Sequence, residues 1–423
     1  MKEFNCDLHL HGPFSGGTSK NMSIPLLAGQ AELKGLDLIA TGDLLHGKWF
    51  KHCQENLVEE KNNVFGFKES KTKFCLSTEI EEAGSRTHHL IFFPDFDSAL
   101  ALKKRLQAYC NNFDGIMAGR PKIHLNGEKI AELVLDSGAL IGPSHAFTPY
   151  TGMYGFYNSI KECYGELAEK IPFIELGLSA DSDLADLLEE LHEKSFLSNS
   201  DAHSPWPSKI GREFNRILLK EPSFKEVKKA LLLKDGRQIT LNCGLNPKEG
   251  KYHLTACRDC LAKYELSQAI KLNWKCVKCN GVIKKGVRDR IIELSRLEKP
   301  MHPGFRPDYL YLLPLAEIIQ LTLKQASPNS TKVSGVWHDF VSRFKNEINV
   351  LIDEPIINLV EVHEETAKNI ERFRRGFVVY IPGGGGAYGK PVICHDEKEF
   401  HEKKIEIESN IYEKKNQKTL SEY

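Results

Sequence analysis

The sequence predicts an α/β protein, because short apolar segments of β type alternate with amphipathic helical patterns over about the first 240 residues. The segments expected to form strands are 4–10, 36–42, 74–80, 89–94, 139–145, 173–178 and 196–203. Strands that alternate with helices usually pair in parallel as βα units. About seven such units fit either a barrel or a doubly wound sheet, and the pattern does not choose between them.

Capping residues mark the helices between these strands. A helix is expected from Ser23 to Gly35, because Ser23 is a good cap and Pro25 suits a first turn. A second is expected from Glu128 to Ser137, where Gly138 ends the pattern. Both helices separate predicted strands, which supports the α/β assignment.

Length and composition limit the class of protein. The 423 residues predict two to four domains, and 41% hydrophobic with 27% charged residues is typical of a globular protein. There is no apolar run of about 18 residues and no signal peptide at the start, so we expect neither membrane insertion nor secretion. Eleven cysteines without an export signal indicate reduced thiols or metal sites. A cytoplasmic location, nucleoid-associated when on DNA, is therefore expected.

Composition divides the chain into four expected segments, 1–245, 246–298, 299–395 and 396–423. The net charge of the whole chain is zero, but 248–299 holds thirteen Lys or Arg and six Asp or Glu, about +7. The third segment opens with three prolines that resemble a linker, continues with helical patterns and ends in FVVYIP and four glycines. The fourth alternates Lys with Glu, as an exposed helix or a frayed tail does.

Histidines and carboxylates recur where the predicted strands end. The set is His9, His11, Asp43, Glu79, His89, His145, Asp201 and His203. In βα folds the carboxyl ends of strands converge on one mouth, so these side chains are expected to meet there. Eight ligands exceed the four that one zinc takes, which predicts two or three divalent ions (Zn, Mg or Mn). For any one of these residues, a helix cap or a satisfied strand end is the plainer interpretation.

The same residues resemble the motifs of the PHP (polymerase and histidinol phosphatase) superfamily. His9-Leu10-His11 is similar to its first motif, Thr41-Gly42-Asp43 to its second, and Asp201-Ala202-His203 to its last. The resemblance implies a distorted (β/α)7 barrel with a trinuclear metal centre in 1–245, in which Glu79 bridges ions and Glu79 and Asp201 are catalytic. The second motif of the superfamily usually ends in a histidine after an aspartate, whereas here Asp43 occupies that place and His46 lies three residues further on. Asp43 is the expected ligand, and His46 is the alternative. His88 is expected to point away from the ions.

Four cysteines predict a structural zinc site. Cys257 and Cys260 form one CxxC pair, Cys276 and Cys279 form another, and fifteen residues separate the pairs. This spacing is typical of a four-cysteine zinc ribbon, which needs the metal because the segment has few apolar residues. With its positive charge and its Trp274 and Tyr264, the segment could bind nucleic acid or could be only a structural clip.

Longer stretches resemble the endonuclease Q family of DNA-repair enzymes. They include Gly142-Pro-Ser-His-Ala-Phe-Thr-Pro-Tyr-Thr151, Ser198-Asn-Ser-Asp-Ala-His-Ser-Pro205 and Pro382-Gly-Gly-Gly-Gly386, within a match of about 390 residues. The resemblance implies a PHP domain, a zinc ribbon and a helical C-terminal domain. It also implies hydrolysis, by metal-activated water, of the phosphodiester 5′ to hypoxanthine, uracil, xanthine or an abasic site.

Several residues are candidates for binding such DNA. Lys20, Lys209 and Arg212 lie close in sequence to strand-end residues, and the loop after His145 carries Phe147, Tyr150 and Tyr154. A flipped base needs aromatic faces and a phosphate needs cations, although surface lysines and packed aromatic rings are equally common. GGGAYGK at 384–390 has the spacing of a phosphate-binding loop, but Pro391 replaces the Ser or Thr that holds magnesium. The glycines are therefore expected to allow a turn or a close backbone approach.

Three functions compete at this stage: a lesion-specific endonuclease, a PHP-type phosphatase or exonuclease, and a noncatalytic nucleic-acid-binding module. The basic cysteine segment disfavours the phosphatase, and the nearly complete ligand set disfavours the noncatalytic module. The expected partner is DNA with damaged bases. Gln417, Leu420 and Tyr423 also resemble a short sliding-clamp motif, although a charged tail that ends this way by chance is the simpler explanation.

Overall fold

A mixed β-sheet dominates the computed structural model, which describes residues 1–411. Its strands are β1 (Lys2–Asp7), β2 (Leu38–Ala40), β3 (Leu57–Glu59), β4 (Phe65–Phe67), β5 (Lys73–Glu82), β6 (His88–Phe93), β7 (Lys122–Ile123), β8 (Leu140–Pro143), β11 (Phe214–Leu219), β12 (Gln238–Gly244) and β15 (Asp308–Tyr311). The main order is β15-β12-β11-β1-β2-β5-β4-β3, with β6 and β7 beside β5 and β8 beside β6. All seven predicted segments contain strands of the structure. The last two segments contain β9 (Phe173–Glu175) and β10 (Ser195–Leu197), which form a separate two-stranded pair.

The expectation that the strands pair in parallel is only partly right. β1, β2 and β5 are parallel neighbours, and so are β9 and β10. β6, however, runs antiparallel to β5 and β8, and β11 runs antiparallel to β1 and β12. Residues 83–87 alone connect β5 to β6, which is too short for a crossover helix, so these two strands must form a hairpin.

The pair β9–β10 fills the space between β8 and β12. The amide of Ala146 donates to the carbonyl of Glu175 at 2.8 Å, and Asn242 Nδ2 donates to the carbonyl of Phe196 at 3.0 Å. Hydrogen bonds outside any strand ladder thus connect the β9–β10 pair to the end of β8 on one side and to β12 on the other. The end of the β1 segment joins the same region, because the amide of His11 donates to the Ala202 carbonyl at 3.1 Å.

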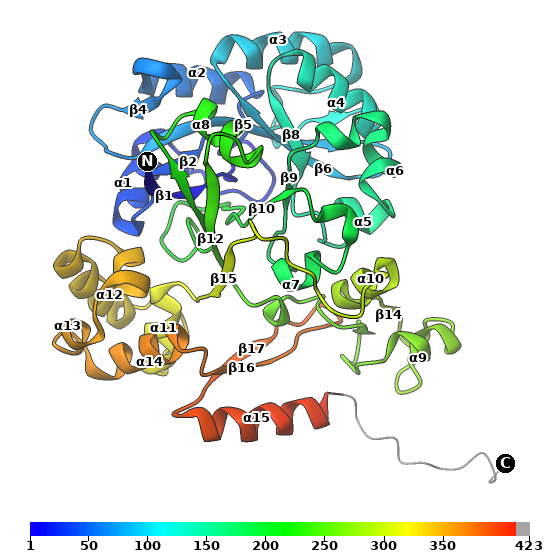
Figure 1. Ribbon diagram of the computed structural model, residues 1–423, viewed down its shortest axis with the longest axis vertical. Helices are drawn as coiled ribbons and strands as arrows, with labels where there is room; N and C mark the ends of the chain where they lie inside the picture. Colours follow the sequence, from blue (N-terminus) through cyan, green and yellow to red (C-terminus); the bar gives the residue numbers. More distant parts are fainter. Residues whose placement is uncertain (412–423) are drawn as a thin grey trace.

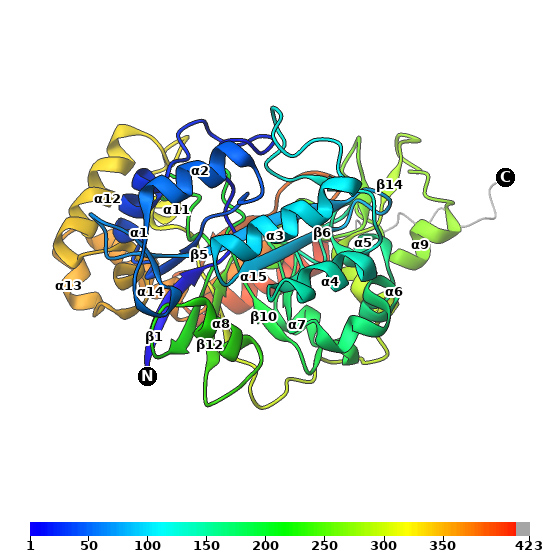
Figure 2. The same cartoon turned by 90° about the horizontal axis from the view of Figure 1, so that it is seen from above.

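Helices cover the outside of this sheet (Figures 1 and 2). They are α1 (Ile24–Lys34), α2 (Gly47–Asn56), α3 (Phe96–Leu106), α4 (Gly127–Asp136), α5 (Met153–Phe156), α6 (Ile160–Tyr164), α7 (Ser182–Ala185) and α8 (Phe224–Leu231). Both predicted helices are confirmed: α1 follows Ser23 and ends at Gly35, whose φ of 94° suits glycine, and α4 ends before Ser137. Short helical turns are η1 (Lys61–Asn63), η2 (Gln107–Tyr109), η3 (Gly165–Lys170), η4 (Glu189–Leu191) and η5 (Pro247–Glu249).

The cysteine-bearing segment is a small unit at one side of the molecule (Figure 1). It contains β13 (Ala256–Cys257), α9 (Leu266–Lys271), β14 (Ile283–Lys284) and α10 (Val287–Leu294), and β13 pairs antiparallel with β14. Its own apolar cluster contains five buried residues, Cys257, Tyr264, Ala269, Cys276 and Ile283, whereas Val287 and Ile291 of α10 belong to the main core. So small a core needs a further stabilising element.

The C-terminal region is mainly helical, as expected. It contains α11 (Leu315–Thr322), α12 (Thr331–Phe344), η6 (Asn349–Asp353), α13 (Ile356–Val360), α14 (Glu364–Arg374), the hairpin β16 (Val378–Ile381) and β17 (Lys390–Ile393), and α15 (Glu397–Asn410). The structure adds one feature to the expected boundary at 299: β15, which follows the proline segment, joins the N-terminal sheet beside β12. The hairpin β16–β17 lies between the orange helices and the cysteine-bearing segment (Figure 1).

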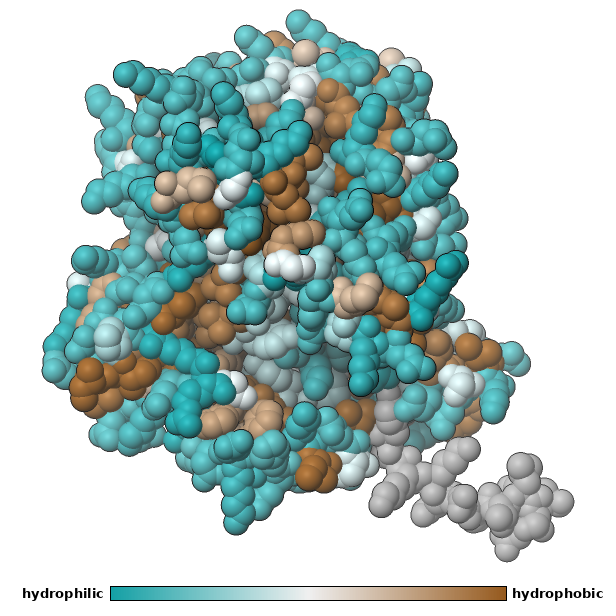
Figure 3. All heavy atoms as spheres, viewed as in Figure 1, coloured by the Kyte–Doolittle hydropathy of each residue, from teal (hydrophilic) through white to brown (hydrophobic). Residues whose placement is uncertain are grey.

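The face shown in Figure 3 is mostly hydrophilic, with separate small hydrophobic patches. Among the described residues, no helix is both long enough and apolar enough to span a bilayer.

Candidate metal centre

His9, His11 and Asp201 form one group of metal-donor atoms. The two histidines directly follow β1, two positions apart, so their side chains lie on the same side of an extended segment. Asp201 follows β10, and its Oδ1 lies 3.0 Å from His11 Nε2 and 3.8 Å from His9 Nε2. The bridge between Leu10 and Ala202 brings these two strand ends together.

Glu79 joins this group to a second one. Its Oε2 lies 3.6 Å from His11 Nε2, and its Oε1 lies 3.1 Å from both His145 Nε2 and His88 Nδ1. The long strand β5 carries Glu79 between the ends of β1 and β8. One carboxylate is therefore shared by two sets of donors, an arrangement that suits two neighbouring divalent ions.

His88, rather than the expected His89, belongs to this cluster. In the β5–β6 hairpin, His88 pairs with Glu81 and therefore shares a face with Glu79, whereas His89 pairs with Ile80 on the opposite face. His89 Nδ1 lies 2.8 Å from the Tyr164 hydroxyl. The expectation for His89 was made without the hairpin register, which places this residue on the face away from Glu79.

Asp43 contacts a candidate ligand instead of lying among the donor atoms. Its Oδ1 accepts from His11 Nδ1 at 2.9 Å and its Oδ2 accepts from the amide of Gly12 at 2.7 Å. Both oxygens are thus used, and His11 presents Nε2 to the cluster. His46, the alternative, stacks on Phe14 at a ring distance of 4.0 Å and faces the Gly115 carbonyl.

Glu175 contacts Nδ1 of His9 in the same way that Asp43 contacts Nδ1 of His11. The sequence reasoning did not identify Glu175. Its carboxylate lies 2.9 Å from His9 Nδ1 and accepts from the amide of His145 at 2.7 Å and from Asn199 Nδ2 at 2.8 Å. Carboxylates of this kind orient histidine ligands and raise their basicity. Glu175 ends the segment Phe173–Glu175, so the rule that selected the other strand-end residues could have found it.

The charges of the cluster balance one another. Burial alone would raise the pKa of Glu79 and Asp201, but neighbouring histidines hold both well below the usual range, and Arg120 lowers the pKa of Glu79 further. Burial alone would lower the pKa of His9, but Glu175, Asp201 and Glu79 raise it to about 9. A divalent cation bound among these side chains would supply the same positive charge, and its binding would release protons from the histidines.

Three residues of this region have strained backbones. Asp43, His145 and Asp201 have φ values of 47°, 31° and 47°, in the left-handed region that disfavours side chains. Such conformations persist where the surrounding structure enforces them, and they cluster at functional sites. Gly42 has a φ of 61°, and a Cβ there would lie 2.0 Å from the Leu10 carbonyl, so only glycine allows β2 to end this close to the histidines.

The donor atoms fit divalent cations. His9 Nε2, His11 Nε2 and Asp201 Oδ1 are buried, and none has a hydrogen-bond partner among the described residues. Unpaired buried polar atoms are costly, and imidazole with carboxylate is a donor set that binds zinc and similar metals. His203 is half-buried at the edge, and its Nδ1 donates to the Asp201 carbonyl at 2.8 Å.

Arg120 is a second residue that the sequence reasoning missed. Its Nη1 lies 3.0 Å from Glu79 Oε2, and its side chain is 27% exposed, so it reaches from the solvent side into the cluster. It lies in the irregular segment before β7, where no motif marks it.

The predicted DNA-binding residues have different environments. Lys20 and Lys209 are exposed, and Lys20 follows Ser19, whose amide donates to the His203 carbonyl at 2.8 Å. Arg212 donates to the Ser200 carbonyl at 3.0 Å, so it supports the loop that carries Asp201.

Two of the three predicted aromatic residues are packed inside. Phe147 and Tyr154 are 3% and 1% exposed and stack at 5.0 Å, and the Tyr154 hydroxyl donates to Glu190 at 2.7 Å. Both rings are thus largely covered by packing, although together with Tyr150 they line a groove of about 330 Å³. Tyr150 is 50% exposed and remains available.

The four cysteines of the two CxxC pairs converge. Their sulfurs lie within 4.8 Å of one another, with 3.5 Å between Cys257 and Cys279 and between Cys260 and Cys276. Amides of Asp259 and Lys278 point at the sulfurs of Cys257 and Cys276 at 3.4 Å, as in zinc knuckles. The arrangement fits one tetrahedral zinc.

A third buried group consists of Glu82, His89 and Cys163, again within 4.8 Å of one another. The hydroxyls of Tyr157 and Tyr164 contact Glu82 and His89 at 2.6 Å and 2.8 Å. This is a closed polar cluster on the opposite face of β6 from His88.

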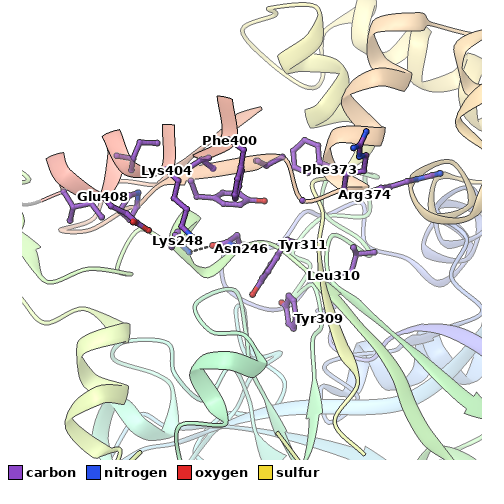
Figure 4. Close-up of a pocket in the computed structure, with 18 residues that line it drawn as sticks. Asn246, Lys248, Tyr309, Leu310, Tyr311, Phe373, Arg374, Phe400, Lys404 and Glu408 are labelled. Carbon is purple, nitrogen blue, oxygen red and sulfur yellow. Dashed lines mark hydrogen bonds between the residues drawn. The ribbon is translucent and has the colours of Figure 1, made fainter. Parts of the chain in front are cut away.

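A groove of about 500 Å³ lies elsewhere, between β15 and α15 (Figure 4). Tyr309 and Tyr311 line it from the sheet, while Phe400 and Lys404 line it from α15. None of the candidate metal-donor groups in the part of the chain described here lines this groove. The cluster at the strand ends is thus separate from it.

Comparisons with known proteins find similar chains. A family model for the MJ0043 C-terminal domain matches residues 314–377. The lesion-specific endonuclease PfuEndoQ of Pyrococcus furiosus is similar, with 44% identity, a TM-score of 0.88 and coverage of 93% of this chain and 96% of that one. A crystal structure of endonuclease Q with a 27-mer duplex bearing an abasic lesion at the active site matches with 44% identity, a TM-score of 0.86 and coverage of 94% and 98%.

One curated relative is longer than this chain. The uncharacterized protein MJ0043 of Methanocaldococcus jannaschii is 43% identical over 290 residues, which cover 67% of this chain. The chain spans only 36% of that protein's length.

Proposed function

The chain belongs to the endonuclease Q family, and on that premise we propose that it is a metal-dependent endodeoxyribonuclease acting on damaged DNA. The proposed reaction is hydrolysis of the phosphodiester 5′ to a deaminated base or an abasic site. Glu79 supports the proposal most strongly, because its carboxylate lies between the group of His9, His11 and Asp201 and the group of His88 and His145.

Two ion positions follow from the donor atoms. His9, His11, Asp201 and Glu79 would hold one ion, and Glu79, His88 and His145 would hold the other. When bound, such ions supply Lewis acidity toward the phosphate and a lowered pKa for water. The fit rests on His9 Nε2, His11 Nε2 and Asp201 Oδ1, three buried atoms that converge on one another without meeting hydrogen-bond geometry within residues 1–411.

The protein's own residues would orient the histidine ligands and neutralise the charge of the phosphate. Asp43 and Glu175 fix the rings of His11 and His9, so that each presents Nε2 to the cluster. Arg120 lies at the entrance, where its guanidinium could neutralise a phosphate oxygen in addition to Glu79. Lys20 and Lys209 are exposed cations for the flanking phosphates.

We also propose a domain organisation for the chain. Residues 1–245 would carry the catalytic site as a distorted PHP barrel, 246–298 a zinc-stabilised ribbon and 299–395 a helical domain. The cysteine geometry and the match at 314–377 support the second and third assignments. The possible clamp motif at Gln417, Leu420 and Tyr423 lies outside the described residues.

End-labelled duplexes test the proposed function. Each duplex carries one uracil, hypoxanthine, xanthine or abasic site, and a matched duplex is undamaged. We expect cleavage of the lesion strand 5′ to the lesion, dependent on added divalent metal. Hydrolysis of phosphomonoesters without any cleavage of these duplexes would refute the proposal.

Asp201→Asn provides the mutational test. Because Asp201 Oδ1 faces both His9 and His11, we expect at least a 100-fold loss of cleavage at fixed metal concentration, with thermal unfolding little changed. Asp136→Asn on α4 is the matched control, since Asp136 is exposed and belongs to none of the candidate metal-donor groups. Wild-type turnover by Asp201→Asn would exclude Asp201 as a metal ligand.

A further inference from the structure

Two lysines and three tyrosines form a continuous strip of side-chain contacts. Lys284 Nζ lies 5.7 Å from the centre of the Tyr150 ring, and Tyr150 meets Tyr252 edge to face at 6.1 Å. Lys251 Nζ then lies 5.3 Å from the Tyr252 ring and 5.9 Å from the Tyr388 ring. We call these five residues the Lys–Tyr strip.

The strip comes from segments that are distant in sequence. Tyr150 lies in the loop after β8, Lys251 and Tyr252 precede the ribbon, and Lys284 ends β14. Tyr388 lies in the glycine-rich loop between β16 and β17. Four segments are therefore brought together to build one surface.

One end of the strip adjoins the metal-donor cluster. Tyr150 is five residues beyond His145. The carbonyl of its neighbour Thr151 accepts from the amide of His88 at 2.9 Å. The loop that displays Tyr150 is thus bonded directly to the strand that carries a candidate ligand.

The strip is available to a ligand. Tyr150 and Tyr388 are 50% and 72% exposed. Aromatic rings exposed together on a surface often mark a place where a ligand binds. Lys251 and Lys284 make no ion pair with a carboxylate among residues 1–411. Proteins that bind single-stranded nucleic acid use exposed aromatic rings to stack on the bases and cations to contact the phosphates.

Backbone contacts hold the far end of the strip in place. The amides of Gly386 and Gly389 donate to the carbonyls of Lys251 and Glu249, both at 2.9 Å. A Cβ at Gly389 would lie 2.2 Å from the Lys248 carbonyl, so this close approach requires glycine. The glycine-rich loop thereby fixes Tyr388 beside Lys251.

Arg290 fixes the near end. Its guanidinium donates to the carbonyls of Tyr154 and Tyr157 at 3.0 Å and 3.2 Å and to Asn158 Oδ1 at 2.8 Å. These bonds join α10 to the loop after β8. Between this loop and β14, Tyr150, Lys284 and Arg290 line a groove of about 330 Å³.

We propose that the Lys–Tyr strip binds unpaired DNA nucleotides next to the scissile phosphodiester. This inference rests on the proposed function. Base faces are hidden by stacking inside a duplex, so exposed tyrosine rings can stack only on bases that are unpaired or flipped, while the lysines meet the phosphates between them. Tyr150 is the member nearest to the reacting site, and Tyr388 is the most distant along the strip.

Binding measurements with chelator present separate affinity from catalysis. Fluorescent probes of one sequence are used as an abasic-site duplex, a single strand and an undamaged duplex, over a series of salt concentrations. The variants are Tyr150→Ala, Tyr388→Ala, Lys251→Ala and Lys284→Ala. The matched controls are Tyr109→Ala and Lys398→Ala, at exposed positions outside the strip.

For each tyrosine variant we expect the Kd for the abasic duplex and the single strand to rise about 5-fold or more, with a smaller change for the undamaged duplex. For each lysine variant we expect the slope of log K against log salt to fall by about one. Unchanged affinity and slope in all four variants, or equal losses in the controls, would overturn the inference. Uniform weakening on all three probes would also overturn it, because the strip would then bind duplex.

Cleavage by the wild-type protein keeps the two proposals apart. If wild type cuts the lesion duplexes while the strip variants bind normally, the strip fails and the proposed function stands. If wild type cuts none of them but the strip variants lose single-strand binding, the strip stands and the proposed function fails. Thermal unfolding of each variant shows whether a loss of binding merely reflects a loss of folding.

Discussion

At the scale of single residues, His88 and His89 are neighbours with different surroundings. His88 lies against Glu79 and His145, while His89 lies against Tyr164 on the other side of the strand. Alternation along β6 alone accounts for this difference. The site therefore depends on one register of the β5–β6 hairpin.

Substitution of each histidine tests that register. We expect His88→Gln to lower the rate of lesion cleavage by about 10-fold to 100-fold, because a candidate ligand is removed. His89→Gln should keep most of the activity and instead lower the melting temperature, since it disturbs a buried contact. Single-turnover cleavage and thermal unfolding of both proteins provide the measurements, and a greater loss of activity in His89→Gln would contradict the assignment.

Glu213 is a buried carboxyl group beside the cluster's supporting residues. Its Oε1 accepts from the amide of Leu245 at 2.9 Å, and its Oε2 has no partner among the described residues. Burial raises the pKa of Glu213 to about 8, although the Leu245 amide and Arg212 lower it in part. The folded protein therefore keeps a proton that the unfolded chain releases near pH 4.5.

This difference makes stability fall as pH rises. Between about pH 4.5 and 8 the folded state binds more protons than the unfolded state, so the free energy of unfolding decreases by at most about 1.4 kcal/mol per pH unit from this group. Glu213→Gln should remove that contribution and flatten the dependence. Urea unfolding at pH 6 and pH 8 checks it, with exposed Glu132→Gln as control. Equal pH dependence in wild type and Glu213→Gln would contradict the expectation.

At the scale of elements, the ribbon is the part with the least core of its own. Its few buried apolar residues surround the cysteine sulfurs, and the Tyr264 hydroxyl lies 3.0 Å from Cys276 Sγ. Burial alone would raise the pKa of the Cys276 thiol, but Tyr264 and the amides of Cys279 and Lys278 lower it to about 6. A thiolate at neutral pH is the form that binds zinc.

Loss of one sulfur should open this element. We expect Cys276→Ser to reduce zinc by about one ion per chain and to raise hydrogen exchange across 250–290, while the sheet keeps its protection. Cys110→Ser, which removes a thiol outside the four-sulfur cluster, is the control. Zinc content that stays unchanged in a variant lacking Cys257, Cys260, Cys276 and Cys279 would exclude the zinc ribbon.

At the scale of the whole molecule, a buried ion pair joins the sheet region to the C-terminal helices. Lys34 Nζ on α1 lies 2.6 Å from Glu347 Oε1, and the two side chains are 1% and 0% exposed. Glu347 also accepts from Trp337 Nε1 at 2.7 Å and from the amide of Leu315 at 3.0 Å. The pair holds the helices in one position against α1.

Removing one partner leaves the other charge buried and alone. We expect Lys34→Met and Glu347→Gln each to lower the free energy of unfolding by about 3–5 kcal/mol, and the double variant to lose less than the sum. Urea unfolding of the four proteins in the cycle measures the coupling. Lys368→Met, which breaks an exposed pair with Glu364, should change stability by no more than about 0.5 kcal/mol. A similar small effect of Lys34→Met would show that the pair contributes little.

The sequence by itself determined the local features of this protein. The apolar runs located strands, Ser23 and Gly35 bounded a helix, and the cysteine spacing predicted sulfurs that do converge. It also brought His9, His11, Glu79, His145 and Asp201 to attention because each lies in or directly after a strand. The resemblance to endonuclease Q is confirmed by 44% identity over nearly the whole chain. Each of these signals depends on residues close together in the sequence.

The tertiary structure alone decided the rest. The hairpin register placed His88 inside the cluster and His89 outside it, and the approach of β2 to β1 turned Asp43 toward His11 Nδ1. Pairing of β12 with β15, and of the glycine-rich loop with residues 248–257, joined segments that composition had separated. These outcomes depend on contacts between residues far apart in the chain, and such contacts are selected by packing and hydrogen bonding of the whole molecule rather than by local pattern.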